Sequence, residues 1–283
     1  MRLDVPACAA ALGLTYDGPC PGGEVGAGYV LLPDGRRAVL SSGRRESAAL
    51  VDLARAAGVP APRYELVTEV AGATVVVQEL LPGHPPAAVD RAVVDGMLAV
   101  SARCTGLLRD SGLPQRELYL HRDGPGFCLH GSLEGHSART AALLATVRAV
   151  PLDELPGDDL VHLDYHPHNI LVTTEEATGE AAEDTTDGTT DGTGGRVITG
   201  VVDWDGAGRG TRAFDLVTLL FWLSRHAPHL APPVRAAAAA LAPPEVLVAC
   251  WAHMALRQVD WSIRHHTAEE VDAWLTVAEQ SPF

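Results

Sequence analysis

Residues 161–172 read VHLDYHPHNILV, and residues 196–205 read RVITGVVDWD. The first stretch carries Asp164 and, five positions later, Asn169, in the spacing H-x-D-x-x-x-x-N. The second stretch continues through a β-rich run to Asp203. Together they supply a carboxylate that can accept a hydroxyl proton, and amide and carboxylate oxygens of the kind that Mg²⁺ prefers. This combination is typical of sites that transfer a phosphoryl group, where a base and a metal-bound phosphate are held together.

The two stretches are distant in the sequence but are expected to pair. Their apolar and β-branched residues predict strands at 169–172 and 197–202, which would form a hairpin and bring Asp203 back beside Asn169. The connection between them, residues 173–195, is rich in Thr, Gly and acidic residues and contains no basic residue. We predict that it is a disordered acidic insertion.

Each residue also has a more ordinary interpretation. An aspartate in a turn usually serves as a turn former or a helix cap. The histidines His162, His166 and His168 are compatible with a zinc site, because catalytic zinc often takes three such ligands. No H-E-x-x-H motif or paired cysteine spacing supports zinc. We therefore interpret His162 as a packing and hydrogen-bonding residue behind the loop.

The conjunction of these motifs resembles the aminoglycoside phosphotransferase and choline kinase family, which shares the two-lobed fold of protein kinases. The family motif usually reads H-G-D-x-x-x-x-N, and Leu163 stands here in place of the glycine. The resemblance implies that Asp164 is the catalytic base and that Asn169 and Asp203 bind Mg²⁺. It further implies that Asp215, in the Asp-Leu pair that follows, braces the loop from the start of a helix.

The fold implied by the resemblance is α+β, a two-lobed protein-kinase-like fold. Residues 1–81 would form a nucleotide-binding N-lobe with an antiparallel sheet and a helix. Residues 82–283 would form a mainly helical C-lobe that is catalytic and substrate-binding. Hydrophobic periodicity and helix-start signals predict helices at 46–57, 89–110, 135–150, 212–226, 232–241, 244–264 and 267–280.

Residues 21–30 look like a glycine-rich turn between two strands, and the turn at 33–35 leads into a third. Glycines let backbone N–H groups approach phosphates. We predict that Gly22, Gly23 and Gly26 cover the triphosphate of ATP or GTP. By resemblance, the segment after the strand at 74–77 is the hinge, where the backbone at Glu79 and Leu81 would bind the purine.

The chain contains no lysine; all its basic residues other than histidine are arginines. Kinase-like sites normally hold the α- and β-phosphates with a lysine on the third strand, paired with a glutamate on the next helix. Ser41 stands near that lysine position. We expect Arg44 or Arg45 to reach the phosphates instead, since guanidinium groups bind phosphate bidentately. Glu46 is the candidate pairing acid.

Composition limits the classes of partner. The net charge of −15 makes nucleic acid an improbable partner and favours cationic small molecules. Five cysteines without a C-x-x-C pair are typical of a reducing compartment. The N-terminus is too weakly hydrophobic for a signal peptide, and no run approaches membrane-spanning length. We therefore expect a cytoplasmic protein without a membrane partner.

We predict a phosphotransferase that moves the γ-phosphoryl group of ATP or GTP to a hydroxyl of a cationic small molecule. By resemblance, the substrate would be an antibiotic, either an aminoglycoside or a basic cyclic peptide of the viomycin or capreomycin type, and the activity would confer resistance. Acids near the cleft and on the C-terminal helices would receive its ammonium groups; the candidates are Asp205, Asp260, Glu269, Glu270 and Asp272. Two alternatives stay open: a kinase for choline, homoserine or a sugar, and a nucleotide-binding protein without turnover.

Overall fold

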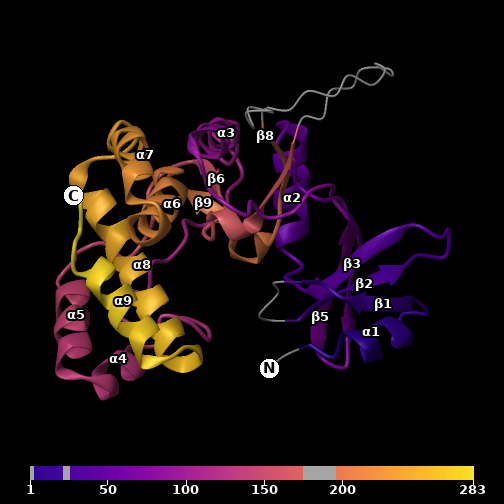
Figure 1. Cartoon of the computed structure of the whole chain (residues 1–283), viewed down its shortest axis with the longest axis horizontal. Helices are drawn as coiled ribbons and strands as arrows, with labels where there is room; N and C mark the ends of the chain where they lie inside the picture. The colour runs from indigo at the N-terminus through magenta and orange to yellow at the C-terminus, as the bar shows by residue number, and fades with distance from the viewer. Residues whose placement is uncertain (1–2, 22–25, 175–195) are drawn as a thin grey trace, which may run out of the picture. The chain divides into compact units, whose positions relative to one another are not determined.

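The structure is a computed structural model that describes residues 3–21, 26–174 and 196–283. The chain forms two compact units, each made from two separate stretches of sequence (Figure 1). The sheet unit comprises Met1–Ala99 and Pro167–Val202. The helical unit comprises Val100–His166 and Asp203–Phe283.

The sheet unit contains a five-stranded antiparallel sheet with the strand order β1-β2-β3-β5-β4. Its strands are β1 (Thr15–Pro19), β2 (Ala27–Leu31), β3 (Arg37–Ser42), β4 (Tyr64–Val70) and β5 (Ala73–Glu79). The predicted turn at 33–35 joins β2 to β3. Asp34 accepts a hydrogen bond from the Arg36 amide at 3.0 Å, and Gly35 adopts a φ of +83°, which glycine tolerates without steric strain.

Helix α1 (Val5–Ala11) packs on this sheet. Asp4 caps its start by accepting a hydrogen bond from the Ala7 amide at 3.1 Å. The shared core consists of small and medium apolar side chains, namely Val5, Cys8, Ala9, Val30, Ala38, Leu40, Val75 and Val77. The sequence did not predict α1, because so short a helix is marginal alone and depends on packing against the sheet.

The sheet unit also contains α2 (Ser47–Ala56) and a hairpin of β7 (Ile170–Thr174) and β8 (Arg196–Val201). The hairpin confirms the predicted pairing of the two informative stretches. Ile170 lies opposite Val201 in antiparallel register, and the Val202 amide donates to the Asn169 carbonyl at 3.0 Å. Most of the predicted acidic insertion, residues 175–195, lies outside the described residues.

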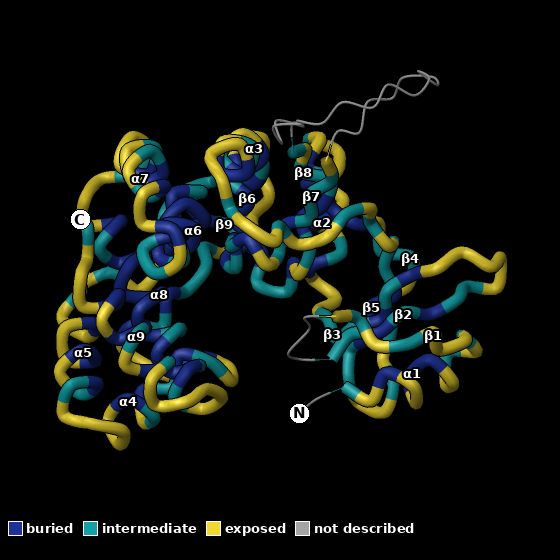
Figure 2. Tube along the Cα trace, in the orientation of Figure 1, coloured by how far each residue is buried: buried dark blue, intermediate teal, exposed yellow. Residues whose placement is uncertain are grey.

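The helical unit is built around two long buried helices (Figure 2). Its described elements include α4 (His130–His136), α5 (Ala138–Arg148), α6 (Ala213–His226), α7 (Ala231–Ala239), α8 (Pro244–His265), α9 (Ala268–Ala278) and the paired short strands β6 (Asp159–Val161) and β9 (Gly208–Gly210). The Phe221 ring of α6 packs against Trp251 of α8 and Trp274 of α9, with centroids 4.8 and 5.6 Å apart. Among the described helices, none has both the length and the apolar character needed to cross a membrane.

Two of the predicted helices were wrong in extent. The helix predicted over residues 89–110 is limited to α3 (Arg91–Ala102), after which the chain forms turns. The helix predicted over residues 135–150 is replaced by α4 and α5, separated at Ser137. The Ser137 hydroxyl accepts from the Thr140 amide at 3.1 Å, and the Thr140 hydroxyl accepts from the Ser137 amide at 3.0 Å. This reciprocal capping starts a new helix at that point.

Candidate active site

Residues 162–166, which we call the aspartate loop, follow β6 in the helical unit. The loop is held by Asp215, the third residue of α6. The Asp215 carboxylate accepts hydrogen bonds from the His162 amide at 2.9 and 3.1 Å and from the Leu163 amide at 2.9 Å. Burial raises the pKa of Asp215 to about 7, and the two amides act in the opposite direction. The bracing that the resemblance implied for Asp215 is therefore present in the geometry.

Leu163, the residue that replaces the usual glycine, has a left-handed backbone with φ of +66°. A residue with a Cβ atom is destabilised there by about 1–2 kcal/mol. Its amide is held by Asp215, and its carbonyl accepts a hydrogen bond from Nη1 of Arg257 at 2.6 Å. Its side chain is also buried, at 8% exposure. Contacts on both sides of the residue thus hold a conformation that leucine disfavours.

The His162 ring is a core element of the loop. It is 2% exposed, and its centroid lies 4.7 Å from that of Trp204 and 6.0 Å from that of Tyr165. This agrees with the packing role predicted for His162. In the part of the chain that the structure describes, no group of three or more His, Cys, Asp or Glu side chains is arranged to hold a metal.

Asp164 faces two cationic or potentially cationic side chains. Its Oδ1 lies 3.0 Å from Nη2 of Arg257 and 3.4 Å from Nε2 of His166. Burial by itself raises the pKa of Asp164, but Arg257 and the neighbouring histidines outweigh burial, and the pKa lies well below its usual range. The side chain remains 24% exposed. Asp164 is therefore an ionised carboxylate that a small molecule can approach.

Asp203 immediately follows Val202, the residue whose amide binds the Asn169 carbonyl. Its backbone is left-handed, with φ 66° and ψ 64°. Burial raises the pKa of Asp203, and the charge of Asp164 raises it further. A bound cation would relieve both effects. The carboxylate of Asp203 and the amide oxygen of Asn169 are hard donors that suit Mg²⁺, whose remaining ligands are commonly phosphates and water.

The residues predicted to cover the phosphates belong to the sheet unit. Gly22 and Gly23 lie outside the described residues, while Gly26 has a φ of +95°, in the region that favours glycine. Arg44 and Glu46 are exposed and form an ion pair at 3.7 Å just before α2. Such an exposed pair contributes little stability, so the Arg44 side chain can change partners at small cost.

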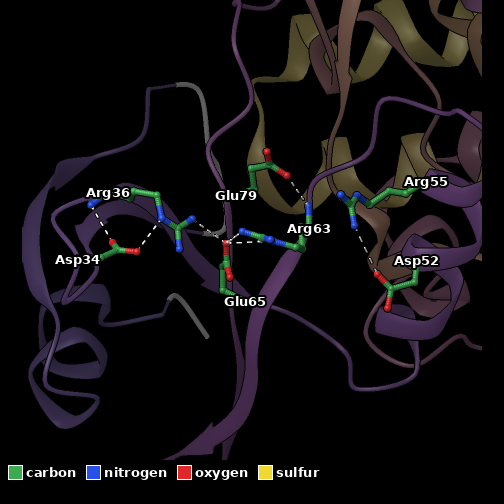
Figure 3. Close-up of polar contacts among 7 residues, drawn as sticks. All are labelled: Asp34, Arg36, Asp52, Arg55, Arg63, Glu65 and Glu79. Atoms are coloured by element: carbon green, nitrogen blue, oxygen red, sulfur yellow. Dashed lines mark hydrogen bonds and ion pairs between the residues drawn. The ribbon is translucent and has the colours of Figure 1, made fainter.

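The hinge residues lie at and after the end of β5. The Glu79 carboxylate accepts a hydrogen bond from the Arg63 amide at 3.0 Å (Figure 3). The Glu79 amide donates to the Arg63 carbonyl at 2.8 Å. Beside this contact, Glu65 joins Arg36 and Arg63 through ion pairs of 3.0 and 2.5 Å (Figure 3). Glu79 is thus fixed at the strand end, two residues before Leu81.

The candidate substrate acids differ in their surroundings. Asp205 lies in a short 3₁₀ helix, Trp204–Gly206, two positions after Asp203. Asp260 is fully buried. It accepts a hydrogen bond from the Ser132 hydroxyl at 2.6 Å and pairs with Arg264 at 2.9 Å. A substrate would reach Asp260 only by breaking these contacts, so its environment favours a structural role.

The remaining candidate acids lie on α9. Glu269 and Glu270 are in its first turn, after the cap residue Thr267. Glu270 pairs with Arg225 at 2.7 Å, and Asp272 pairs with Arg139. Glu269 is therefore the acid of this helix that carries no ion pair in the part of the chain described here.

Sequence reasoning missed Arg257, the residue that contacts Asp164 and Leu163. It lies on α8, and 94 positions separate it from Leu163. A usable signal was present. Positions 253, 257, 260 and 264 carry polar residues at helical spacing in a helix whose buried residues are mostly apolar. A polar stripe on a buried helix indicates that its members have polar partners.

His253 lies one turn before Arg257 on α8. Its burial is expected to make the stability of the protein depend on pH. It is 4% exposed, and its Nδ1 donates to the Leu118 carbonyl at 2.6 Å. Burial lowers the pKa of His253 to about 4, against the opposing effect of that hydrogen bond. The folded protein therefore favours the neutral ring. The contribution of the neutral ring to the free energy of unfolding is complete above pH 6.5. It falls by up to about 3 kcal/mol as the pH decreases towards 4.

We expect His253→Gln to remove this part of the acid destabilisation. Urea unfolding of the two proteins at pH 7 and near pH 4 measures the effect as a smaller pH-dependent loss in the variant. His229→Gln is the matched control, since His229 is exposed. An unchanged pH dependence in His253→Gln would contradict the assignment.

The geometry can be compared with known proteins. A family model described as the phosphotransferase enzyme family matches residues 27–179. A thermostable mutant of aminoglycoside phosphotransferase APH(4)-Ia, in a ternary complex with AMP-PNP and hygromycin B, gives a TM-score of 0.62 at 16% identity, covering 96% of this chain and 94% of that chain. Aminoglycoside-3'-phosphotransferase of type VIII gives 0.57 at 18% identity, covering 89% and 98%. These likenesses confirm the predicted α+β, kinase-like fold. A comparison with curated proteins finds no match.

Proposed function

The chain belongs to the phosphotransferase enzyme family, and we propose that it transfers the γ-phosphoryl group of ATP or GTP to a hydroxyl of a cationic small molecule. The observation that carries this proposal is Asp164. Its carboxylate lies on a braced loop, remains partly exposed and is kept ionised by Arg257 and His166. An ionised carboxylate in that setting is suited to accept a hydroxyl proton.

In the proposed reaction, Asp164 accepts a hydrogen bond from the acceptor hydroxyl and directs its oxygen towards the γ-phosphorus. The new bond forms between that oxygen and phosphorus as the bond to the β-γ bridging oxygen breaks, and the nucleoside diphosphate leaves. The hydroxyl becomes more acidic as the P–O bond forms, so even a carboxylate with a lowered pKa can take its proton.

We propose that Asn169 and Asp203 hold Mg²⁺. Both present oxygen donors of the required kind, and the buried carboxylate of Asp203 gains from a neighbouring cation. When bound, Mg²⁺ would supply positive charge that stabilises the negative charge developing during transfer.

We propose that the sheet unit binds the nucleotide. Gly22, Gly23 and Gly26 would cover the phosphates, and Glu79 and Leu81 would contact the base. Arg44, paired with Glu46, is the candidate cation in a chain that has no lysine. The guanidinium group offers a planar fork that matches phosphate oxygens.

We propose a cationic antibiotic as the acceptor, either an aminoglycoside or a basic cyclic peptide, with drug resistance as the outcome. The net charge of −15 favours a cation, and the related APH(4)-Ia structure contains hygromycin B. Asp205 is a candidate ammonium-binding acid because it lies two positions after Asp203. On α9, Glu269 is preferred to Glu270 and Asp272, which pair with arginines.

The proposal predicts magnesium-dependent phosphorylation. Purified protein is incubated with labelled ATP or GTP and a panel of aminoglycosides, basic cyclic peptides, choline, homoserine and sugars, and products are identified by mass spectrometry. We expect a phosphorylated cationic antibiotic, loss of product with excess EDTA, and recovery when Mg²⁺ is restored. If only choline, homoserine or a sugar is phosphorylated, the antibiotic is not the acceptor, and the protein is a kinase for that compound.

The test also separates a binding protein from an enzyme. The specific observation in favour of binding without turnover is Ser41 on β3, near the position expected for a phosphate-binding lysine. Nucleotide binding by calorimetry without product from any acceptor would favour that second function.

A further inference from the structure

Arg257 makes two contacts with consecutive residues of the aspartate loop. Its Nη1 donates to the Leu163 carbonyl at 2.6 Å, and its Nη2 pairs with Oδ1 of Asp164 at 3.0 Å. One planar guanidinium therefore holds both the backbone and the side chain of the loop. A lysine ammonium is a point donor at the end of a flexible chain and does not reproduce this fork.

The pair has the character of a partly buried interaction. The side chains of Arg257 and Asp164 are 28% and 24% exposed. Exposed ion pairs usually contribute about 0–1 kcal/mol because solvent screens them and both side chains lose freedom. Here Arg257 also satisfies a backbone carbonyl, and that carbonyl belongs to a residue in a disfavoured left-handed conformation. Arg257 thus acts at the strained point of the loop.

Arg257 holds the Asp164 carboxylate by contact. Its guanidinium plane is already fixed by the hydrogen bond from Nη1 to the Leu163 carbonyl, so Nη2 meets Oδ1 of Asp164 from a defined direction. The second oxygen of Asp164 is not part of this contact. Arg257 therefore restricts the orientation of the carboxylate through one of its two oxygens.

We propose that Arg257 is a positioning residue for phosphoryl transfer, which fixes the Asp164 carboxylate so that it can receive the acceptor hydroxyl. This inference rests on the proposed function, because Asp164 is the proposed base. Arg257 acts through Asp164 and Leu163, and its loss is expected to slow turnover more than it weakens binding of nucleotide or acceptor.

The chain offers a closely matched control in Arg209, on β9 of the same unit. Its Nη2 pairs with Asp158 at 2.6 Å, and its Nη1 donates to the Leu113 carbonyl at 2.8 Å. Its side chain is 24% exposed. Arg209 thus makes the same two kinds of contact, a carboxylate and a backbone carbonyl, without touching the aspartate loop in any contact of the described residues.

The experiment compares Arg257→Ala, Arg257→Lys and Arg209→Ala with the wild type in kcat, KM and thermal unfolding. For Arg257→Ala we expect kcat to fall about 10- to 100-fold, with KM values within about threefold. Arg257→Lys should recover only part of kcat. Added guanidinium salt, at concentrations that do not unfold the protein, should partly restore Arg257→Ala. Arg209→Ala should keep kcat within about threefold.

Amide hydrogen exchange supplies a readout that does not require turnover. We expect faster exchange at His162 and Leu163 in Arg257→Ala but not in Arg209→Ala, because only the first loses a contact to the loop. Equal losses of kcat and of loop protection in the two variants would overturn the proposal, as would an unchanged kcat in Arg257→Ala. If the wild type phosphorylates no acceptor, the proposed function fails, and the exchange rates still decide whether Arg257 positions the loop.

Discussion

Replacing Asp164 by Asn is expected to reduce kcat/KM for phosphoryl transfer by about 10²- to 10⁴-fold, the usual contribution of a general base. Asn has nearly the same shape, and its amide oxygen can still accept a hydrogen bond from Arg257. It cannot take the proton of the acceptor hydroxyl. We therefore expect the affinity for nucleotide, measured by calorimetry, to change by less than about threefold, so that the defect appears in turnover.

Asp158→Asn is the matched control for this prediction. Asp158 is the carboxylate partner of Arg209, in an arginine pair of the same unit. It should lose one ion pair and retain transfer activity. The base assignment is untenable if Asp164→Asn keeps a tenth or more of the wild-type kcat/KM. The same holds in cells if drug protection conferred by the chain survives this substitution.

The hairpin of β7 and β8 could be predicted from the sequence because the features that indicate it are local. Residues in β7 and β8 have high β-propensity, and the sequence between them is rich in Thr, Gly and acidic residues, with alanine as its only apolar residue type besides glycine. The role of Asp215 could be predicted for another reason. Its Asp-Leu pair follows the second stretch, as the family resemblance implies. In both cases the order and spacing of residues along the chain indicated which segments lie close together.

Arg257 and Asp260 were not accessible in the same way. Both lie on α8, whose helical character is easily predicted, but the rotation of a helix against its neighbours depends on tertiary packing. Asp260 was predicted as a substrate acid and is instead fully buried beside Ser132 and Arg264. Arg257 carries no local motif. Its partners are fixed only when α8 packs beside the aspartate loop.

The position that usually carries the phosphate-binding lysine and its proposed replacement differ in how firmly the structure holds them. Ser41 lies on β3 opposite Val76 of β5, so its place in the sheet is well defined. The proposed replacement, Arg44, lies after the strand, where its 3.7 Å pair with Glu46 leaves the two side chains 48% and 75% exposed. Strand pairing specifies a backbone register strongly, whereas exposed long side chains are held weakly. The nucleotide affinity of Arg44→Ala therefore tests directly whether Arg44 binds the phosphates.

Replacing Asp215 by Ala is expected to lower the free energy of unfolding by about 3–5 kcal/mol and to abolish phosphoryl transfer. The substitution leaves the amides of His162 and Leu163 buried without their acceptor, and each unsatisfied buried donor costs about 1–3 kcal/mol. It also removes the hydrogen bond at the Leu163 amide, so this left-handed residue keeps its carbonyl bond to Arg257 but loses its bond to α6. Denaturant unfolding and transfer assays measure the two losses.

Asp215→Asn distinguishes loop bracing from simple loss of core packing. Its amide oxygen can accept from the loop amides, but its NH₂ group cannot, so we expect a smaller loss of stability and measurable residual transfer. Thr218→Ala serves as a packing control, since Thr218 is a buried residue of the same helix whose hydroxyl contacts the Phe214 carbonyl and the Met254 sulfur. Equal effects of Asp215→Ala and Thr218→Ala on transfer would contradict the bracing role. A selective loss in Asp215→Ala would mean that the aspartate loop, strained at Leu163, functions only while its backbone is held from α6.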